Sequence, residues 1–261
     1  MKKALLLIFL VHTLYATINI SLSISPELFV VKSIGKDKIE CNVIVPKGAS
    51  PHTYKPKPKQ MVKLQDAKIY FAIGVEFENV WLEKFKSQNP NLKIVHLDKD
   101  IKKINKNPHI WLSIKNLKTM AKEVYNSLIL IDSKNSDFYK KNYENFLKKL
   151  TDCSQDIKDI LSKKKSKTFM TFHPAFTYFA DEFSLTQIPI EIDGKEPSLK
   201  ELLKVIKKAK ESGIKTIITS PEFSDKSAKI IANELDATIV KISPLNPNIC
   251  QTLKQIANSL R

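Results

Sequence analysis

The stretch from Ser133 to Lys165, SKNSDFYKKNYENFLKKLTDCSQDIKDILSKKK, decides how the chain is organised, because it contains neither glycine nor proline. Its apolar residues recur at spacings of three and four, which predicts one long amphipathic helix over residues 133–164. The apolar residues are Tyr139, Tyr143, Phe146, Leu147, Leu150, Ile157, Ile160 and Leu161. Such a helix runs on the order of 40 Å, which is wider than one small lobe. It is therefore predicted to join two lobes.

On both sides of this helix, short apolar segments typical of strands alternate with helical patterns. Strands are predicted at 18–24, 38–46, 68–74, 92–98, 167–176, 188–193, 214–220 and 237–243. Helices are predicted at 26–35, 56–67, 77–88, 109–131, 198–213, 226–235 and 249–260. Alternation of this kind predicts α/β lobes with mostly parallel sheets flanked by helices. We assign residues 17–132 to an N-terminal lobe and 165–261 to a C-terminal lobe.

The first sixteen residues have the pattern of a secretory signal peptide. Lys2 and Lys3 precede an apolar run from Ala4 to Tyr15, and Ala16 is a small residue suited to cleavage. The alternatives are a membrane anchor or a buried first helix. A signal peptide over residues 1–16 predicts an exported, periplasmic protein, and no cysteine follows the run to accept a lipid.

The formal net charge of +16 raises the question of nucleic-acid binding. The lysines, however, are spread through every segment without interleaved aromatic residues, so we interpret them as solvated helix faces and expect no nucleic-acid partner. The three cysteines, Cys41, Cys153 and Cys250, allow one disulfide in an oxidising compartment. The sequence does not decide which pair forms it.

Three histidines lie after or at the end of predicted strands or at the entry to a helix, and each is next to a proline. They are His52 in SPHTY, His109 in NPHIW and His173 in FHPAF. In open α/β sheets ligands bind beyond the carboxyl ends of the strands, so these rings are expected to meet in a cleft between the lobes. His96 also ends a strand but lacks a neighbouring proline, and we consider it a weaker candidate.

Three imidazoles suit Zn(II), which takes nitrogen ligands in tetrahedral geometry. The set fits either a carrier or a zinc hydrolase, and a hydrolase also needs a general base. Glu222, in SPEFSDKSA, is the acid best placed for that role. A helix N-terminal acid that interacts with the helix dipole is the other interpretation of Glu222.

Four segments in order resemble the metal-specific solute-binding proteins of bacterial ABC importers, and most of all their zinc-uptake branch. They are PKGASPHTYKPKPKQMVKLQDA with the following GVEFENVW, then NPHIWLSIKN, TFHPAFTYFADEFSL and SPEFSDKSAKIIANEL. The resemblance implies two lobes joined by a long helix, a metal in the cleft, and delivery to an inner-membrane ABC permease and its ATPase. It implies a monomer that performs no catalysis.

The resemblance also implies that His52, His109 and His173 are metal ligands, and that histidine rather than glutamate at position 173 favours zinc over manganese. A manganese or other transition-metal receptor of the same family is the alternative. The chain departs from the family pattern in ISPLNPN, where Ser243 and Asn246 replace the usual acids. The fourth ligand is then water, Glu222 or Asn246. Glu222 and Asn246 are also candidates for supporting a ligand without contacting the metal.

Overall fold

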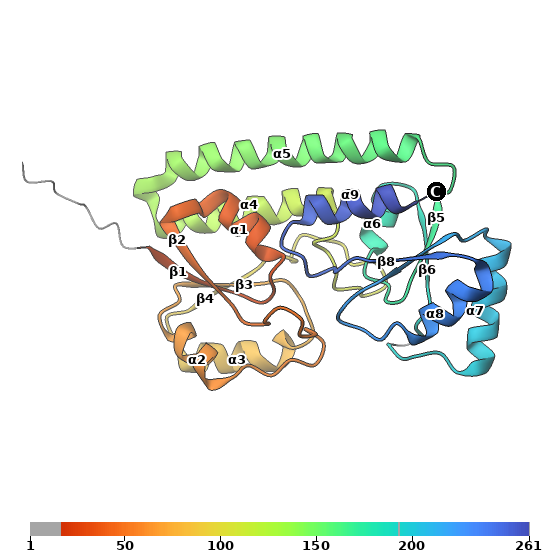
Figure 1. The fold of residues 1–261 in the computed structure, drawn as a ribbon. Coiled ribbons are helices and arrows are strands. Elements are labelled where there is room, and N and C mark those ends of the chain that lie inside the picture. The colour runs from red at the N-terminus through yellow and green to blue at the C-terminus, as the bar shows by residue number, and fades with distance from the viewer. Residues whose placement is uncertain (1–16, 193, 261) are drawn as a thin grey trace, which may run out of the picture.

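The computed structural model describes residues 17–192 and 194–260, so the signal peptide predicted at 1–16 lies outside the described residues. Two four-stranded sheets, each entirely parallel, lie side by side beneath one long helix (Figure 1). This is the predicted fold class. None of the described helices has the length and apolar character that crossing a membrane requires.

The N-terminal sheet has the strand order β2-β1-β3-β4. Its strands are β1 (Ile18–Leu22), β2 (Ile39–Val43), β3 (Ile69–Ala72) and β4 (Lys93–His96). All four residues of β3 are buried, as expected for a central parallel strand covered on both faces. One face is covered by α1 (Glu27–Gly35) and α4 (Ile114–Ile131), and the other by α2 (Pro58–Gln65) and α3 (Glu78–Gln88) (Figure 1). Two 3₁₀ turns, η1 (Lys36–Lys38) and η2 (Ser133–Asn135), complete this half.

The C-terminal sheet has the order β6-β5-β7-β8, which repeats the topology of the first. Its strands are β5 (Thr168–Thr171), β6 (Thr186–Pro189), β7 (Thr216–Thr219) and β8 (Thr238–Lys241). The helices are α6 (Thr177–Glu182), α7 (Leu199–Glu211), α8 (Lys226–Leu235) and α9 (Ile249–Ser259). Helix α9 lies beside the long helix, whereas α7 and α8 lie on the opposite side of the sheet (Figure 1).

The long helix is α5 (Ser136–Ser162), whose 27 residues correspond to about 40 Å. It packs on α1 and α4 in the N-terminal half and on α9 in the C-terminal half. The structure pairs Cys153 of α5 with Cys250 of α9 in a disulfide and leaves Cys41 free, which answers the question that the sequence left open. The helix is thus attached to both lobes.

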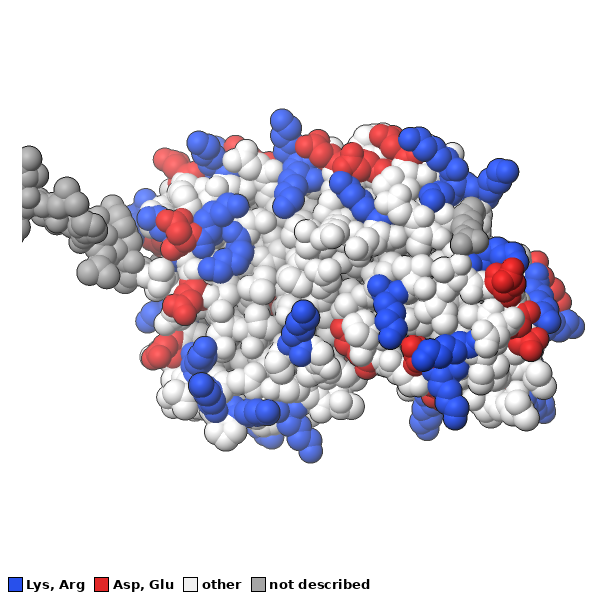
Figure 2. Space-filling view, viewed as in Figure 1, with Lys and Arg blue, Asp and Glu red and all other residues white. Residues whose placement is uncertain are grey.

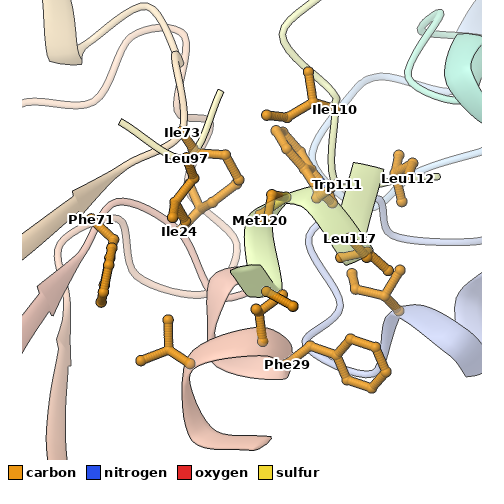
Figure 3. Close-up of a cluster of buried hydrophobic side chains, with 14 of the residues drawn as sticks. Ile24, Phe29, Phe71, Ile73, Leu97, Ile110, Trp111, Leu112, Leu117 and Met120 are labelled. Carbon is orange, nitrogen blue, oxygen red and sulfur yellow. The ribbon is translucent and has the colours of Figure 1, made fainter. Parts of the chain in front are cut away.

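One cluster of buried side chains runs through both lobes and under α5. Figure 3 shows Trp111 within this cluster, close to Ile110 and Leu112. The Trp111 side chain is fully buried, and its indole Nε1–H donates a hydrogen bond of 2.8 Å to the carbonyl of Pro244. Because Pro244 follows the last strand of the second sheet, this contact joins the lobes across the core.

Several predicted boundaries are wrong, and β5, for example, ends at 171 rather than 176. Local hydrogen bonding explains another of the larger errors. Helix α4 begins at Ile114 rather than at 109, because the Ser113 hydroxyl accepts from the Asn116 amide and caps the helix there. Strand β6 begins at residue 186 instead of 188, and α5 begins at 136, after a 3₁₀ turn. Helix α6 was not predicted.

Candidate metal site between the lobes

The three predicted histidines meet where the two sheets face each other. His52 lies in the loop between β2 and α2, His109 in the loop between β4 and α4, and His173 directly after β5. One ligand atom from each ring lies within 4.8 Å of the other two. They line a cavity of about 700 Å³. In the described part of the chain, this is the one group of three or more histidine, cysteine or acidic side chains with such spacing.

In each of the three rings, Nδ1 already has a side-chain oxygen within hydrogen-bonding distance. Nδ1 of His52 lies 3.0 Å from Glu76 Oε2, and Nδ1 of His173 lies 2.8 Å from Glu191 Oε1. Nδ1 of His109 lies 2.8 Å from the side-chain oxygen of Asn107. An acceptor at Nδ1 keeps the proton there and leaves Nε2 as the free ligand nitrogen.

The Nε2 atoms of His109 and His173 are 3.2 Å apart, and the two ring centroids are 4.9 Å apart. The ring centroid of His52 lies 5.9 Å from that of His109 and 5.3 Å from that of His173. Each ring thus offers a nitrogen atom to the same small region of the cavity. Their arrangement fits a borderline-soft cation such as Zn(II).

Burial and neighbouring groups shift the pKa of His52 and that of His109 in opposite directions. The hydrogen bond to Glu76 raises the pKa of His52, against the opposing effect of partial burial. Burial, reinforced by His173 and His52, holds the pKa of His109 well below its usual range. His109 is therefore neutral at physiological pH, which is the form that binds a metal.

The loop that carries His109 is attached to the C-terminal lobe, although it belongs in sequence to the first half. The Tyr178 hydroxyl donates to the carbonyl of Asn107 at 2.7 Å. The side-chain amide of Asn107 donates to the carbonyl of Pro174 at 2.8 Å. His109 and His173 are thus linked through one hydrogen-bonded network, and His52 stands on the other side of the cleft.

Several residues that contact the histidines were not predicted from the sequence, and they differ in how clearly the sequence indicates them. Asn107 stands two residues before His109 and accepts from its backbone amide, a side-chain turn that the letters NPH indicate. Glu191 follows β6, the neighbour of β5 in the sheet, so its position past a strand end was a usable signal. Phe223 stacks on His173 with centroids 4.5 Å apart, and no pattern pointed to it.

Glu222 and Asn246, the fourth-ligand candidates, line a second cavity of about 460 Å³ between the lobes. The Glu222 carboxylate accepts hydrogen bonds from the hydroxyls of Ser220 and Ser243, and it is not part of the histidine group. His96 is 53% exposed and lies 3.8 Å from an aspartate, away from that group.

Two parallel-sheet lobes held by one long helix, with three clustered histidines at the interlobe face, are the architecture of a metal-binding solute-binding protein of an ABC importer. The family comparison makes the assignment specific. The chain belongs to the family described as ZnuA, zinc-uptake complex component A periplasmic, whose model matches residues 20–257.

Individual relatives agree with this assignment. The chain is 29% identical over 230 residues to the high-affinity zinc uptake system protein ZnuA of Bacillus subtilis (strain 168), covering 79% of this chain and 72% of that protein. It is 26% identical over 232 residues to the manganese ABC transporter substrate-binding lipoprotein PsaA of Streptococcus pneumoniae, covering 80% and 74%. A crystal structure of ZnuA superimposes with a TM-score of 0.89 at 37% identity, covering 93% of this chain and 97% of the other.

Proposed function

We propose that this protein captures Zn(II) outside the cytoplasm through His52, His109 and His173 and delivers it to a membrane ABC permease and its ATPase. The observation that carries the proposal is the convergence of three imidazoles within 4.8 Å. Neutral imidazole nitrogens are good ligands for zinc, and a fourth position completes a tetrahedron. Water would fill that position, or Glu222 or Asn246 after a shift from the second cavity that they line.

The choice of zinc over manganese rests on the donor atoms. Relatives of this chain include proteins named for either metal. Manganese prefers carboxylate and other oxygen donors, whereas imidazole suits zinc. The nearest carboxylates, Glu76 and Glu191, already accept at Nδ1 of their histidines and so act as supports of the ligand rings. Three nitrogens without a directly presented carboxylate favour zinc.

A zinc hydrolase is disfavoured because the acid suggested as its general base does not line the histidine cavity, and because Glu76 and Glu191 already accept from the histidine rings. Glu222, the acid suggested for that role, is hydrogen-bonded by two serine hydroxyls and lines the other cavity. We therefore infer a receptor that holds and releases its cargo without covalent chemistry. We expect it to be monomeric, to have no nucleic-acid partner, and to consist of lobes 17–132 and 165–261 joined by helix 133–164. With residues 1–16 removed as a signal peptide, it would act in the periplasm.

Calorimetric titration of the metal-stripped chain 17–261 with Zn(II) and with Mn(II) tests the proposal. We expect tight one-to-one zinc binding, weak manganese binding, and loss of zinc binding in His173→Ala. His96→Ala is the matched control, since His96 is exposed and outside the group. Zinc binding that survives His173→Ala, or tighter binding of manganese than of zinc, would contradict the proposal.

A further inference from the structure

The chain that leads from β4 into α4 is fastened to the C-terminal lobe at both of its ends. We call its residues 104–115 the His109 segment. The backbone amide of Ile104 donates to the Tyr178 hydroxyl at 3.1 Å, and the Ser113 hydroxyl donates to the Glu182 carboxylate at 2.6 Å. Tyr178 and Glu182 both belong to α6, so one helix of the C-terminal lobe holds both ends of the segment.

The middle of the His109 segment is attached to the same lobe. The Asn107 side-chain amide donates to the carbonyl of Pro174, the residue that follows His173. Beyond His109, the indole of Trp111 donates to a carbonyl in the loop after β8. His109 lies between these two contacts, so its position is set by the C-terminal lobe although it precedes α5 in the sequence.

The chain around His52 lacks such contacts. We call residues 44–59 the His52 segment, and within the part of the chain that the structure describes, its hydrogen bonds and its ion pair all join it to the N-terminal lobe. The second cavity lies between part of this segment, residues 45–48, and the C-terminal residues Pro221 and Ser243. The lobes are thus hydrogen-bonded beside His109 and separated by a cavity next to the His52 segment.

The ring of His52 is also the most exposed of the three. Its side chain is 27% exposed, and that of its partner Glu76 is 47% exposed. The corresponding values are 11% for His173 and 6% for Glu191, and His109 is buried. Because water competes for an exposed contact, the pair that orients His52 is weaker than the pair that orients His173.

The shape of the molecule agrees with this asymmetry. Helix α5 runs along both lobes (Figure 1), and in Figure 2 the outline is continuous along this helix at the top and indented between the lobes at the bottom. Two restraints therefore hold the lobes together, namely α5 and the His109 segment. The His52 segment is outside both of them, which makes it the part of the cleft wall that can move most easily.

We propose that α6, with Tyr178 as a positioning residue, makes the His109 segment a working part of the C-terminal lobe, so that zinc enters and leaves through movement of the His52 segment. This inference rests on the proposed function, because it gives the order in which the proposed ligands engage. His109 and His173, with their Nε2 atoms 3.2 Å apart, receive the cation first. His52 then closes on it, and during release His52 leaves first.

Distances between spin labels test which parts of the chain move together. The free cysteine Cys41 is replaced by serine, and labels are attached in pairs at three exposed positions that are lysines in the wild type. Lys55 lies in the His52 segment, Lys106 in the His109 segment, and Lys204 on α7 of the C-terminal lobe. Pulsed electron spin resonance measures each distance in the metal-stripped chain and after addition of Zn(II).

We expect zinc to change the distances from position 55 to positions 106 and 204, and to leave the distance between 106 and 204 unchanged. A distance between 106 and 204 that changes as much as that between 55 and 204 would overturn the proposal. So would the absence of any change in a chain that binds zinc, because the His52 segment would then not move.

Hydrogen exchange of the metal-stripped chain tests the same division without zinc. Tyr178→Phe removes the hydroxyl that holds the His109 segment, so amides of this segment should exchange at least about two-fold faster, while those of the His52 segment exchange as in the wild type. Tyr125→Phe is the matched control, because the Tyr125 ring stacks on Tyr143 and its hydroxyl has no hydrogen-bond partner among the described residues. Equal exchange in the two variants would contradict the role given to Tyr178.

Zinc release from two ligand variants completes the test and keeps the two proposals apart. His52→Ala should still bind one zinc and release it to excess chelator at least about ten-fold faster than the wild type, since even a residue that supports a ligand contributes about that factor. His173→Ala should bind none. Equal behaviour of the two variants would overturn the order of release. If the wild type binds no zinc but Tyr178→Phe still loosens the His109 segment, the zinc proposal fails and the division of the lobes stands.

Discussion

Asn107 offers the most direct test of how the site is built, because its side chain has two separate tasks. Its oxygen accepts from the backbone amide of His109 at 2.9 Å and lies 2.8 Å from Nδ1 of the same residue. Its amide donates to the carbonyl of Pro174 at 2.8 Å and to the Thr177 hydroxyl at 3.1 Å. Asn107→Ala removes both sets of contacts and leaves the three histidines of the proposed site in the sequence.

The expected cost follows from the bonds that His109 loses. A hydrogen bond contributes about 0.5–1.5 kcal/mol, so two of them amount to roughly 1–3 kcal/mol. All of this free energy counts toward metal binding if the two bonds form only when the ring is oriented for the metal. At about 1.4 kcal/mol for each factor of ten, this predicts zinc binding weaker by roughly 5- to 150-fold. Loss of a partner that orients a metal-binding histidine generally costs about 10- to 100-fold in affinity, which is the same range.

Asn107→Asp separates the two tasks. The carboxylate still accepts from His109, but it cannot donate to Pro174 or Thr177. We therefore expect zinc affinity between those of the wild type and Asn107→Ala. The assay is competition with a chromophoric chelator on metal-stripped protein, with Asn145→Ala on the exposed surface of α5 as control. Wild-type affinity in Asn107→Ala would refute the reasoning, because the ring would then be positioned without this partner.

Three further outcomes are expected. Burial raises the pKa of the Glu78 carboxyl to about 7. Between about pH 4.5 and pH 7 the folded chain therefore holds a proton that the unfolded chain has released. The free energy of unfolding should fall as the pH rises through this range, by up to roughly 3 kcal/mol. Urea unfolding at pH 5 and pH 8 should show this slope reduced in Glu78→Gln, and an unchanged slope would assign it to other groups. Replacing Cys153 and Cys250 by serine should cost about 2–5 kcal/mol of unfolding free energy and leave zinc stoichiometry at one, as denaturation and titration would show. Crystal structures with and without metal should differ by a lobe rotation below about 20°, since α5 packs on both lobes, and a larger hinge rotation would contradict this expectation.

The alternation of strand and helix patterns was sufficient to predict two parallel-sheet lobes and the helix between them. Each element has its own periodicity, and a long helix without glycine or proline has few alternatives. The boundaries were less predictable because they depend on single hydrogen bonds. The cap at Ser113, for instance, leaves His109 in a loop rather than in a helix.

The clustering of the three histidines could also be anticipated, since residues after parallel strands meet at the same edge of a sheet. The partners of the rings were harder to foresee. Glu191 reaches His173 only because β6 is placed next to β5, and Tyr178 holds the loop of Asn107 through contacts made across the lobes. Such pairings are set by tertiary structure, and no local spacing encodes them.

Position 243 shows how one departure from the family pattern changes the chemistry that we expect of the site. Ser243 stands where the resemblance places an aspartate, and its hydroxyl donates to Glu222, whose other oxygen accepts from Ser220. An aspartate at 243 would bring a second negative charge against Glu222, which is unfavourable for both carboxylates. The serine instead keeps Glu222 hydrogen-bonded in its own cavity, and the histidine group offers nitrogen donors with no carboxylate among them. A hard cation such as manganese then gains little, whereas zinc still finds three suitable ligands. With three nitrogen donors and no carboxylate in the group, the loss of one ring would remove a large share of what holds the cation.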